Sequence, residues 1–249
     1  MSPPRLHDQL LQLFSERSAQ NLKVCLEHPD FQSFLSVHSL SIPRHELVLA
    51  FTHTSFAHEY EVPHQELSEF FGDAVVQLIV TSELMKLYPH EKEGKLSKLR
   101  SSIVNENTLA KVAAYLKLSE LILVGRGEYT KELHLHDAVI SDTLEALMAK
   151  IYSHHGMEVA SNSLLGWLRS SVPAAFEMDN IDTYDAKSKL QEATLAKYKT
   201  LPRYSADTLS EGFLVKLWVN EDVVAQGIYT SKKIGERELA RKTLENKEF

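Results

Sequence analysis

The stretch EFFGDAVVQLIV, residues 69–80, places Glu69 and Asp73 in a run that is otherwise as apolar as a protein core. A second stretch, AVISDTLEALMAKIY at residues 138–152, does the same with Asp142 and Glu145. Removing a carboxylate from water is costly unless a partner compensates for its charge. A hard cation is the partner that such acids suggest.

The spacing of these acids indicates that they share helix faces. Glu69 and Asp73 are four residues apart, and Asp142 and Glu145 are three apart, so each pair lies on one side of a helix. Glu66 lies one turn before Glu69. If the two helices pack together, four carboxylates converge, and an all-oxygen site of this kind suits Mg²⁺, for which Mn²⁺ substitutes. The alternative is that the acids lie on the solvated sides of two amphipathic helices, but the apolar flanks and the duplication favour the metal site.

Composition limits the classes of protein that remain. The chain has 249 residues, 43% of them hydrophobic, which is enough for one large or two modest cores. Its single cysteine, Cys25, is expected to be a buried apolar residue in a reducing compartment. No stretch approaches a membrane span, and charged residues interrupt the first 30 positions, so no secretory signal is predicted. A soluble, cytoplasmic protein with no membrane partner is expected.

Hydrophobic periodicity divides the chain into two parts. Apolar residues recur at helical spacing up to about residue 170, and the proline-containing stretch SSVPAAFEMDNIDTY at residues 170–184 breaks this pattern. We expect a linker at 173–182 and a domain boundary near residue 182. Beyond it the pattern predicts a helix at 185–198, strands at 203–208, 213–219 and 223–229, and a helix at 231–247.

Charge is distributed unevenly between these parts. The whole chain carries −7, but residues 183–249 hold twelve Lys and Arg against ten Asp and Glu, a net +2. Ser231 is a natural N-cap, yet Lys232 and Lys233 follow it in the first helical turn, where the helix dipole disfavours cations. A phosphate docked at that helix end would reverse the effect; the alternative is two solvated lysines.

These stretches also resemble a known family. HQELSEFFGDAV (64–75) resembles the signature helix of the ribonuclease III family, and SDTLEALMAKIY (141–152) its second acidic helix. FTHTSFAHE (51–59), EGKLSKLRSSIVNENTLAKVA (93–113) and LSELILVGRGE (118–128) resemble its early Thr-His segment, its long central helix and the loop before the second acidic helix. In the tail, KSKLQE (187–192) and SKKIGERELARKTL (231–244) resemble the first and last helices of a double-stranded-RNA-binding domain.

The resemblance implies a mainly α fold: a helical extension at 1–28, an all-helical endonuclease domain at 29–172 and, after the linker, an α-β-β-β-α double-stranded-RNA-binding domain at 183–249. It implies a homodimer that hydrolyses double-stranded RNA with Mg²⁺, leaves 5'-phosphate and 3'-hydroxyl ends and processes ribosomal and other structured RNAs. One of Phe70 and Phe71 would insert into the partner subunit. Carried over by motif, the resemblance implies that the metal ligands are Glu69, Asp142 and Glu145, and that the residues most tied to turnover are Asp73 and Glu145. It implies that Glu66 is a further acid tied to RNA handling or the dimer interface. The RNA contacts that it implies are Gln191, Glu192, Lys232 and Lys233.

Three segments depart from the family pattern. The short TLSEG (208–212) replaces a loop that usually carries Gly-Pro-x-His, and Gly235 stands where alanine is usual, a helix-interior cost of ~1 kcal/mol. The loop YTKELHLH (129–136) lacks the usual glycines and arginines. Its His134 and His136 with His154 and His155 are either surface residues, which we favour, or part of a zinc site.

Two other functions stay open at this point. The first is a non-catalytic relative that binds structured RNA as a scaffold, although a scaffold has no need of a costly anionic cluster. The second is a helical metal-dependent hydrolase of small phosphorylated molecules, which would leave the tail unexplained.

Overall fold

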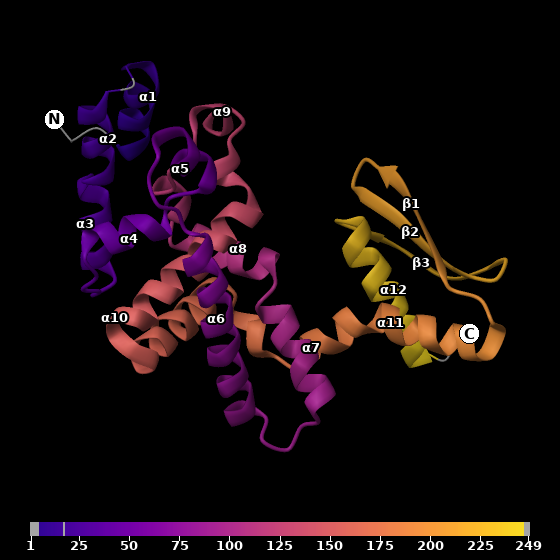
Figure 1. Ribbon diagram of the computed structural model, residues 1–249. Coiled ribbons are helices and arrows are strands. Elements are labelled where there is room, and N and C mark those ends of the chain that lie inside the picture. The colour runs from indigo at the N-terminus through magenta and orange to yellow at the C-terminus, as the bar shows by residue number, and fades with distance from the viewer. Residues whose placement is uncertain (1–4, 17, 247–249) are drawn as a thin grey trace. The chain divides into compact units, whose positions relative to one another are not determined.

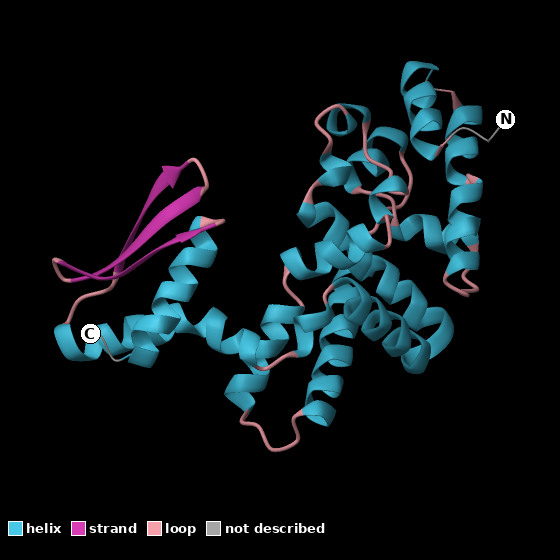
Figure 2. Cartoon of the chain, turned by 180° about the vertical axis from the view of Figure 1, so that it is seen from behind, coloured by secondary structure: helices cyan, strands magenta, loops and turns pink. Residues whose placement is uncertain are grey.

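The computed structural model describes residues 5–16 and 18–246. The chain forms two compact units, Met1–Phe176 and Glu177–Phe249. The first is helical, and the second combines helices with one sheet (Figures 1 and 2), which confirms the predicted fold class. No helix in the described part of the chain is long and apolar enough to cross a membrane.

The helices of the first unit follow the predicted periodicity. They are α1 (Leu6–Glu16), α2 (Ala19–Leu26), α3 (Pro29–Val37), α4 (Arg44–Ala50), α5 (Thr54–Tyr60), α6 (Glu66–Leu87), α7 (Glu93–Ile103), α8 (Glu106–Tyr115), α9 (Arg126–Tyr129) and α10 (Asp137–Ser171), with 3-10 turns η1 (Leu118–Glu120), η2 (Leu133–Leu135) and η3 (Pro173–Phe176).

The helices α6 and α10 carry the two acidic stretches and pack against each other (Figure 1). Val76 and Ile79 on α6, and Leu144 and Leu147 on α10, are buried at helical spacing. Farther along, α10 is interrupted at Gly156, where φ is 77° and ψ is −178°. The part of α10 before this break holds Asp142 and Glu145, so a packed core supports both acidic stretches.

The segment at 93–113 differs from the single long helix that the resemblance suggested. It forms α7 and α8, which are separated at Val104 and Asn105. The Asn105 side chain accepts a hydrogen bond from the Thr108 N–H at 3.0 Å, and the Thr108 hydroxyl donates to the Ser102 carbonyl, also at 3.0 Å. An asparagine that caps a new helix competes with continuation of the old one, which explains the break.

The expected linker at 173–182 is also shorter than predicted. Its first residues form η3, where the Phe176 carbonyl accepts a hydrogen bond from the Tyr88 hydroxyl at 2.6 Å, and α11 already begins at Asp179. Residues 179–184 contain neither proline nor glycine, so nothing in the local sequence stops this helix. The helix predicted from residue 185 therefore starts six residues earlier.

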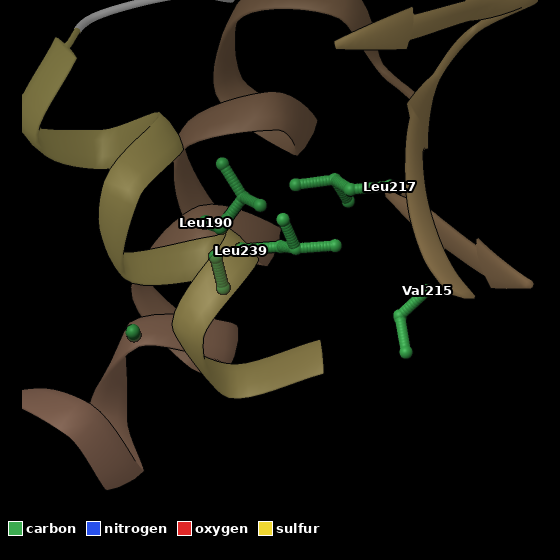
Figure 3. Close-up of a cluster of buried hydrophobic side chains, with 6 residues drawn as sticks. Leu190, Val215, Leu217 and Leu239 are labelled. Carbon is green, nitrogen blue, oxygen red and sulfur yellow. The ribbon is translucent and has the colours of Figure 1, made fainter. Parts of the chain in front are cut away.

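The second unit has the predicted order of elements. It consists of α11 (Asp179–Tyr198), β1 (Arg203–Leu209), β2 (Gly212–Val219), β3 (Asp222–Tyr229) and α12 (Lys232–Asn246). The strands pair antiparallel in the order β1-β2-β3, and both helices lie on one face of the sheet (Figure 2). Leu190 of α11 and Leu239 of α12 meet Val215 and Leu217 of β2 in the core between them (Figure 3).

This core requires glycine at position 235. That corrects the expectation that Gly235 only lowers the stability of the helix. A Cβ atom at this position would lie 2.6 Å from Val215 Cγ2 and 2.7 Å from Tyr229 Cδ2. Val215 is fully buried and its branched side chain has little freedom to move. The glycine therefore allows α12 to approach the sheet closely.

Candidate active site

Three carboxylates converge where α6 crosses α10. Glu69 comes from α6, and Asp142 and Glu145 come from the first turns of α10. One carboxylate oxygen of each lies within 4.8 Å of the others. The helices approach closely here because Gly72 has no side chain: a Cβ atom would lie 1.8 Å from the Glu145 carbonyl oxygen. Gly72 thus permits the contact that brings the acids together.

The electrostatics of this cluster show uncompensated negative charge. Burial, followed by repulsion from Asp73, Asp142 and Glu69, raises the pKa of Glu145 to about 8. Burial is also the largest cause that raises the pKa values of Glu69 and Asp142. Half-buried carboxylates that repel one another form a site that a divalent cation would stabilise. Among the described residues, this is the one group of three or more metal-ligating side chains close enough to hold an ion.

The other two predicted acids flank the cluster. The amide Nε2 of Gln77 lies 2.9 Å from both carboxylate oxygens of Asp73, which is not one of the three converging residues. The charge of Asp73 still contributes to the raised pKa of Glu145. Glu66 has a side chain that is 64% exposed, and its Oε2 lies 3.7 Å from His64 Nδ1. The structure therefore brings together three of the four acids expected to converge, with Asp73 and Glu66 beside them.

Glu106, the first residue of α8, is a charged neighbour that we did not predict from sequence. After burial, repulsion from Glu106 is the largest cause of the raised pKa of Asp142. A glutamate in the first turn of a helix is common for reasons of the helix dipole alone. Only the packing of α8 against α10 relates it to the site.

In the described part of the chain, His134, His136, His154 and His155 do not come together as a group that could hold zinc. His134 is 7% exposed, which corrects its assignment to the surface, and its ring stacks on Tyr129 with centroids 4.8 Å apart. The His7 ring of α1 lies 4.8 Å from the same His134 ring. His155 Nε2 instead accepts a hydrogen bond from the Ser41 N–H. The helix α1 therefore packs against Tyr129 and His134 of the loop at 129–136, whose composition departs from the family pattern.

A row of exposed apolar side chains runs along α6, spaced at three, four and seven residues, as on one side of a helix. Exposed fractions are 82% for Leu67, 80% for Phe70, 43% for Phe71, 53% for Leu78 and 62% for Met85. Adjacent exposed apolar side chains of this extent mark an interaction surface. We call this row the α6 stripe.

The predicted RNA-contacting residues lie on the surface of the second unit. Gln191 and Glu192 are exposed on α11, and Lys232 and Lys233 are exposed in the first turn of α12. The Ser231 hydroxyl oxygen accepts a hydrogen bond from the Ile234 N–H at 3.2 Å, which confirms the predicted N-cap. Strands β1 and β2 are joined by only two residues, 210 and 211, as the short loop suggested.

Comparison with known proteins identifies the family. A family model described as Ribonuclease-III-like matches residues 45–171. Ribonuclease 3 of Corynebacterium diphtheriae is 33% identical over 230 residues, which cover 90% of this chain and 92% of that protein. Ribonuclease 3 of Borreliella burgdorferi is 32% identical over 243 residues, which cover 93% of this chain and 98% of that one.

A solved structure agrees with these sequence matches. It is the nuclease domain of ribonuclease III from Campylobacter jejuni, described for structural flexibility in a region involved in dimer formation. The identity is 31% and the TM-score 0.55, and the match covers 57% of this chain and 99% of that domain. The acidic helix pair, the family model and relatives that match over nearly the whole chain lead to one conclusion: the chain belongs to the ribonuclease III family of endoribonucleases.

Proposed function

We propose that this protein hydrolyses phosphodiester bonds in double-stranded RNA with Mg²⁺, for which Mn²⁺ substitutes, and leaves 5'-phosphate and 3'-hydroxyl ends. The observation that carries the proposal is the convergence of Glu69, Asp142 and Glu145 within 4.8 Å. All three are oxygen donors, as Mg²⁺ prefers, and their mutual repulsion is of the kind that a cation relieves. They are the residues that would hold the ion.

When bound, the metal would polarise a phosphoryl oxygen, lower the pKa of a water and neutralise charge on the leaving oxygen. The residues of the chain supply the rest. Gln77 fixes the Asp73 carboxylate beside the cluster through two contacts of 2.9 Å. In this position Asp73 is the residue that we assign to accept a proton during turnover, with Glu145 as the ligand most tied to the reaction. Glu66, which is more exposed, faces the approaching RNA or the partner subunit.

The second unit supports duplex RNA as the substrate. The deep, narrow major groove of A-form RNA hides base edges, so proteins recognise it by shape, 2'-hydroxyls and phosphates. Lys232 and Lys233 place two positive side chains in the first turn of α12, and both these charges and the N-terminal end of a helix attract phosphate. Gln191 and Glu192 of α11 would contact the same duplex. Residues 183–249 therefore act, in this proposal, as the double-stranded-RNA-binding domain.

The α6 stripe supports a homodimer. Phe70 is 80% exposed in a single chain, and a symmetric interface would bury it against the same surface of a second copy. Two acidic sites would then face one duplex and cut opposite strands. The proposed substrates are ribosomal and other structured RNAs in the cytoplasm.

The test is cleavage of a labelled RNA duplex with Mg²⁺ by three proteins: the unchanged chain, Glu145→Gln and Glu158→Gln. Glu158 is exposed on the same helix and serves as the matched control. We expect the unchanged chain and Glu158→Gln to cut, and Glu145→Gln to bind without cutting. If all three bind and none cuts, a scaffold replaces the nuclease, and if none binds in a gel shift, a small-molecule phosphohydrolase becomes the better reading.

A further inference from the structure

A buried polar pair joins α6 and α10 next to the acidic cluster. Gln65, the residue before α6, is 2% exposed, and Thr143, which lies between Asp142 and Glu145 on α10, is fully buried. The Thr143 hydroxyl donates a hydrogen bond to the Gln65 side-chain oxygen at 3.3 Å. Burying polar side chains is unfavourable unless they are hydrogen-bonded, and this bond lets the pair lie inside the contact between the two helices.

The backbone of Gln65 fixes the first turn of α6. Its carbonyl accepts hydrogen bonds from the N–H groups of Ser68 at 2.7 Å and Glu69 at 2.9 Å, while its own N–H donates to the Thr52 carbonyl at 3.0 Å. Thr52 is buried, and its neighbour His53 donates its N–H to the Leu123 carbonyl at 3.0 Å. A shift of Gln65 would therefore move Glu69, one of the three converging acids.

Thr143 is fixed just as firmly on the other helix. Its hydroxyl proton is shared between Gln65 and the Val139 carbonyl, which lies 2.8 Å away. This second bond holds the side chain in one orientation relative to the axis of α10. Asp142 precedes Thr143 directly and Glu145 follows two residues later, so the orientation of this helical turn determines where both carboxylates lie.

The contact between the helices thus has two fixed points. At Gly72 the backbone of α10 sets how closely the helices approach, which is a steric limit. At Gln65 and Thr143 a hydrogen bond sets how they are aligned, because a hydrogen bond is directional and an apolar contact is not. Glu69 lies between Gln65 and Gly72 in the sequence. Distance and alignment together determine how the three acids meet.

We propose that Gln65 and Thr143 are positioning residues that set the alignment of α6 and α10 and thereby the affinity of the acidic cluster for its metal. This inference rests on the proposed function of that cluster. The pair acts through Glu69, Asp142 and Glu145. Side chains that orient metal ligands from outside the coordination shell commonly change metal affinity by about tenfold to a hundredfold when they are replaced.

The test is calorimetric titration of Mn²⁺ into the protein without RNA. Thr143→Val keeps the shape of the side chain and removes the hydroxyl, Thr143→Ser keeps the hydroxyl, and Thr194→Val is the matched control. Thr194 is also fully buried, and its hydroxyl donates to the carbonyl four residues earlier, but it belongs to the second unit. We expect Thr143→Val to weaken Mn²⁺ binding by about tenfold or more, and the other two variants to stay within about threefold of the unchanged chain.

A double variant separates alignment from simple stability. Gln65→Leu with Thr143→Val replaces both polar partners with apolar ones, which leaves no buried group without a partner. We expect its thermal midpoint to recover relative to Thr143→Val while Mn²⁺ binding stays weak. If Thr143→Val binds Mn²⁺ like the unchanged chain, or if the double variant regains full affinity, the positioning role is wrong. If the unchanged chain itself binds no Mn²⁺, the proposed metal site fails, and the inference fails with it.

Discussion

Gly72→Ala is the substitution that tests the contact between the two acidic helices most severely. The added Cβ atom would lie 1.8 Å from the Glu145 carbonyl oxygen and 2.4 Å from its carbonyl carbon. Favourable contacts between heavy atoms lie at about 3.5 Å, so the helices would have to separate locally by more than ~1 Å. The obstructing atoms are backbone in the middle of α10, and they have no rotamer into which to move away.

Two effects on stability oppose each other in this variant. Alanine gains ~1 kcal/mol of helix propensity over glycine, whereas overpacking a core costs ~1–3 kcal/mol or more. Because the overlap involves backbone, we expect the upper end of that cost to prevail, so that the first unit is destabilised by ~2 kcal/mol but still folds. Displacing Glu145 by ~1 Å should also lower the rate of duplex cleavage by about a hundredfold.

Urea unfolding followed by circular dichroism measures the stability, and single-turnover cleavage of a labelled duplex measures the rate. Gly166→Ala is the matched control because Gly166 lies in α10 and a Cβ atom there meets nothing within 4 Å. That control should be as active as the unchanged chain and should be stabilised by up to ~1 kcal/mol. Full stability and full activity of Gly72→Ala would refute the reasoning that close approach at Gly72 builds the site.

Further predictions concern charge, packing and assembly. Because the pKa of Glu145 is raised from 4.5 to about 8, the metal-free protein should lose stability as pH rises from about 4.5 to about 8. Glu145→Gln should flatten this pH dependence in thermal denaturation. An unchanged slope in that variant would contradict the assignment of the pH dependence to Glu145. Burial lowers the pKa values of His7 and His134. The stability that depends on their neutral forms is therefore present above pH 6.5 and is lost as pH falls through the lowered pKa values. NMR titration of the imidazoles should give midpoints below 6.5, and a midpoint at or above that value would show that the rings are not buried as described. Gly235→Ala should lower the thermal midpoint of the second unit despite better helix propensity, because Val215 blocks the methyl group, and an increase would show that α12 can move away from the sheet. Phe70→Glu should shift sedimentation from dimer to monomer without destabilising the isolated chain, since Phe70 is 80% exposed, and an unchanged dimer would place the interface elsewhere.

The sequence predicted those features whose cause lies in a few neighbouring residues. The acids in apolar surroundings indicated both helices of the site, because helical spacing alone places Asp142 and Glu145 on one face. The three strands and the Ser231 cap followed from local pattern and turn chemistry in the same way.

The features that the sequence did not predict depend on which segments meet in space. Glu106 affects the site because α8 packs against α10, and His134 is buried where its ring meets His7 of α1 and Tyr129. From the sequence alone Gly235 only weakens a helix, and its role in close packing depends on the sheet that lies against α12. The break at Asn105 is a local exception, because asparagine is a preferred N-cap residue and the signal for a new helix lies in the sequence itself.

The most direct test of the central claim is anomalous scattering from crystals of the protein grown with Mn²⁺. A metal site made by α6 and α10 predicts a strong anomalous peak between the carboxylates of Glu69, Asp142 and Glu145, and its loss or marked weakening in Glu145→Gln. Absence of a peak between these three side chains at saturating Mn²⁺ would contradict the account.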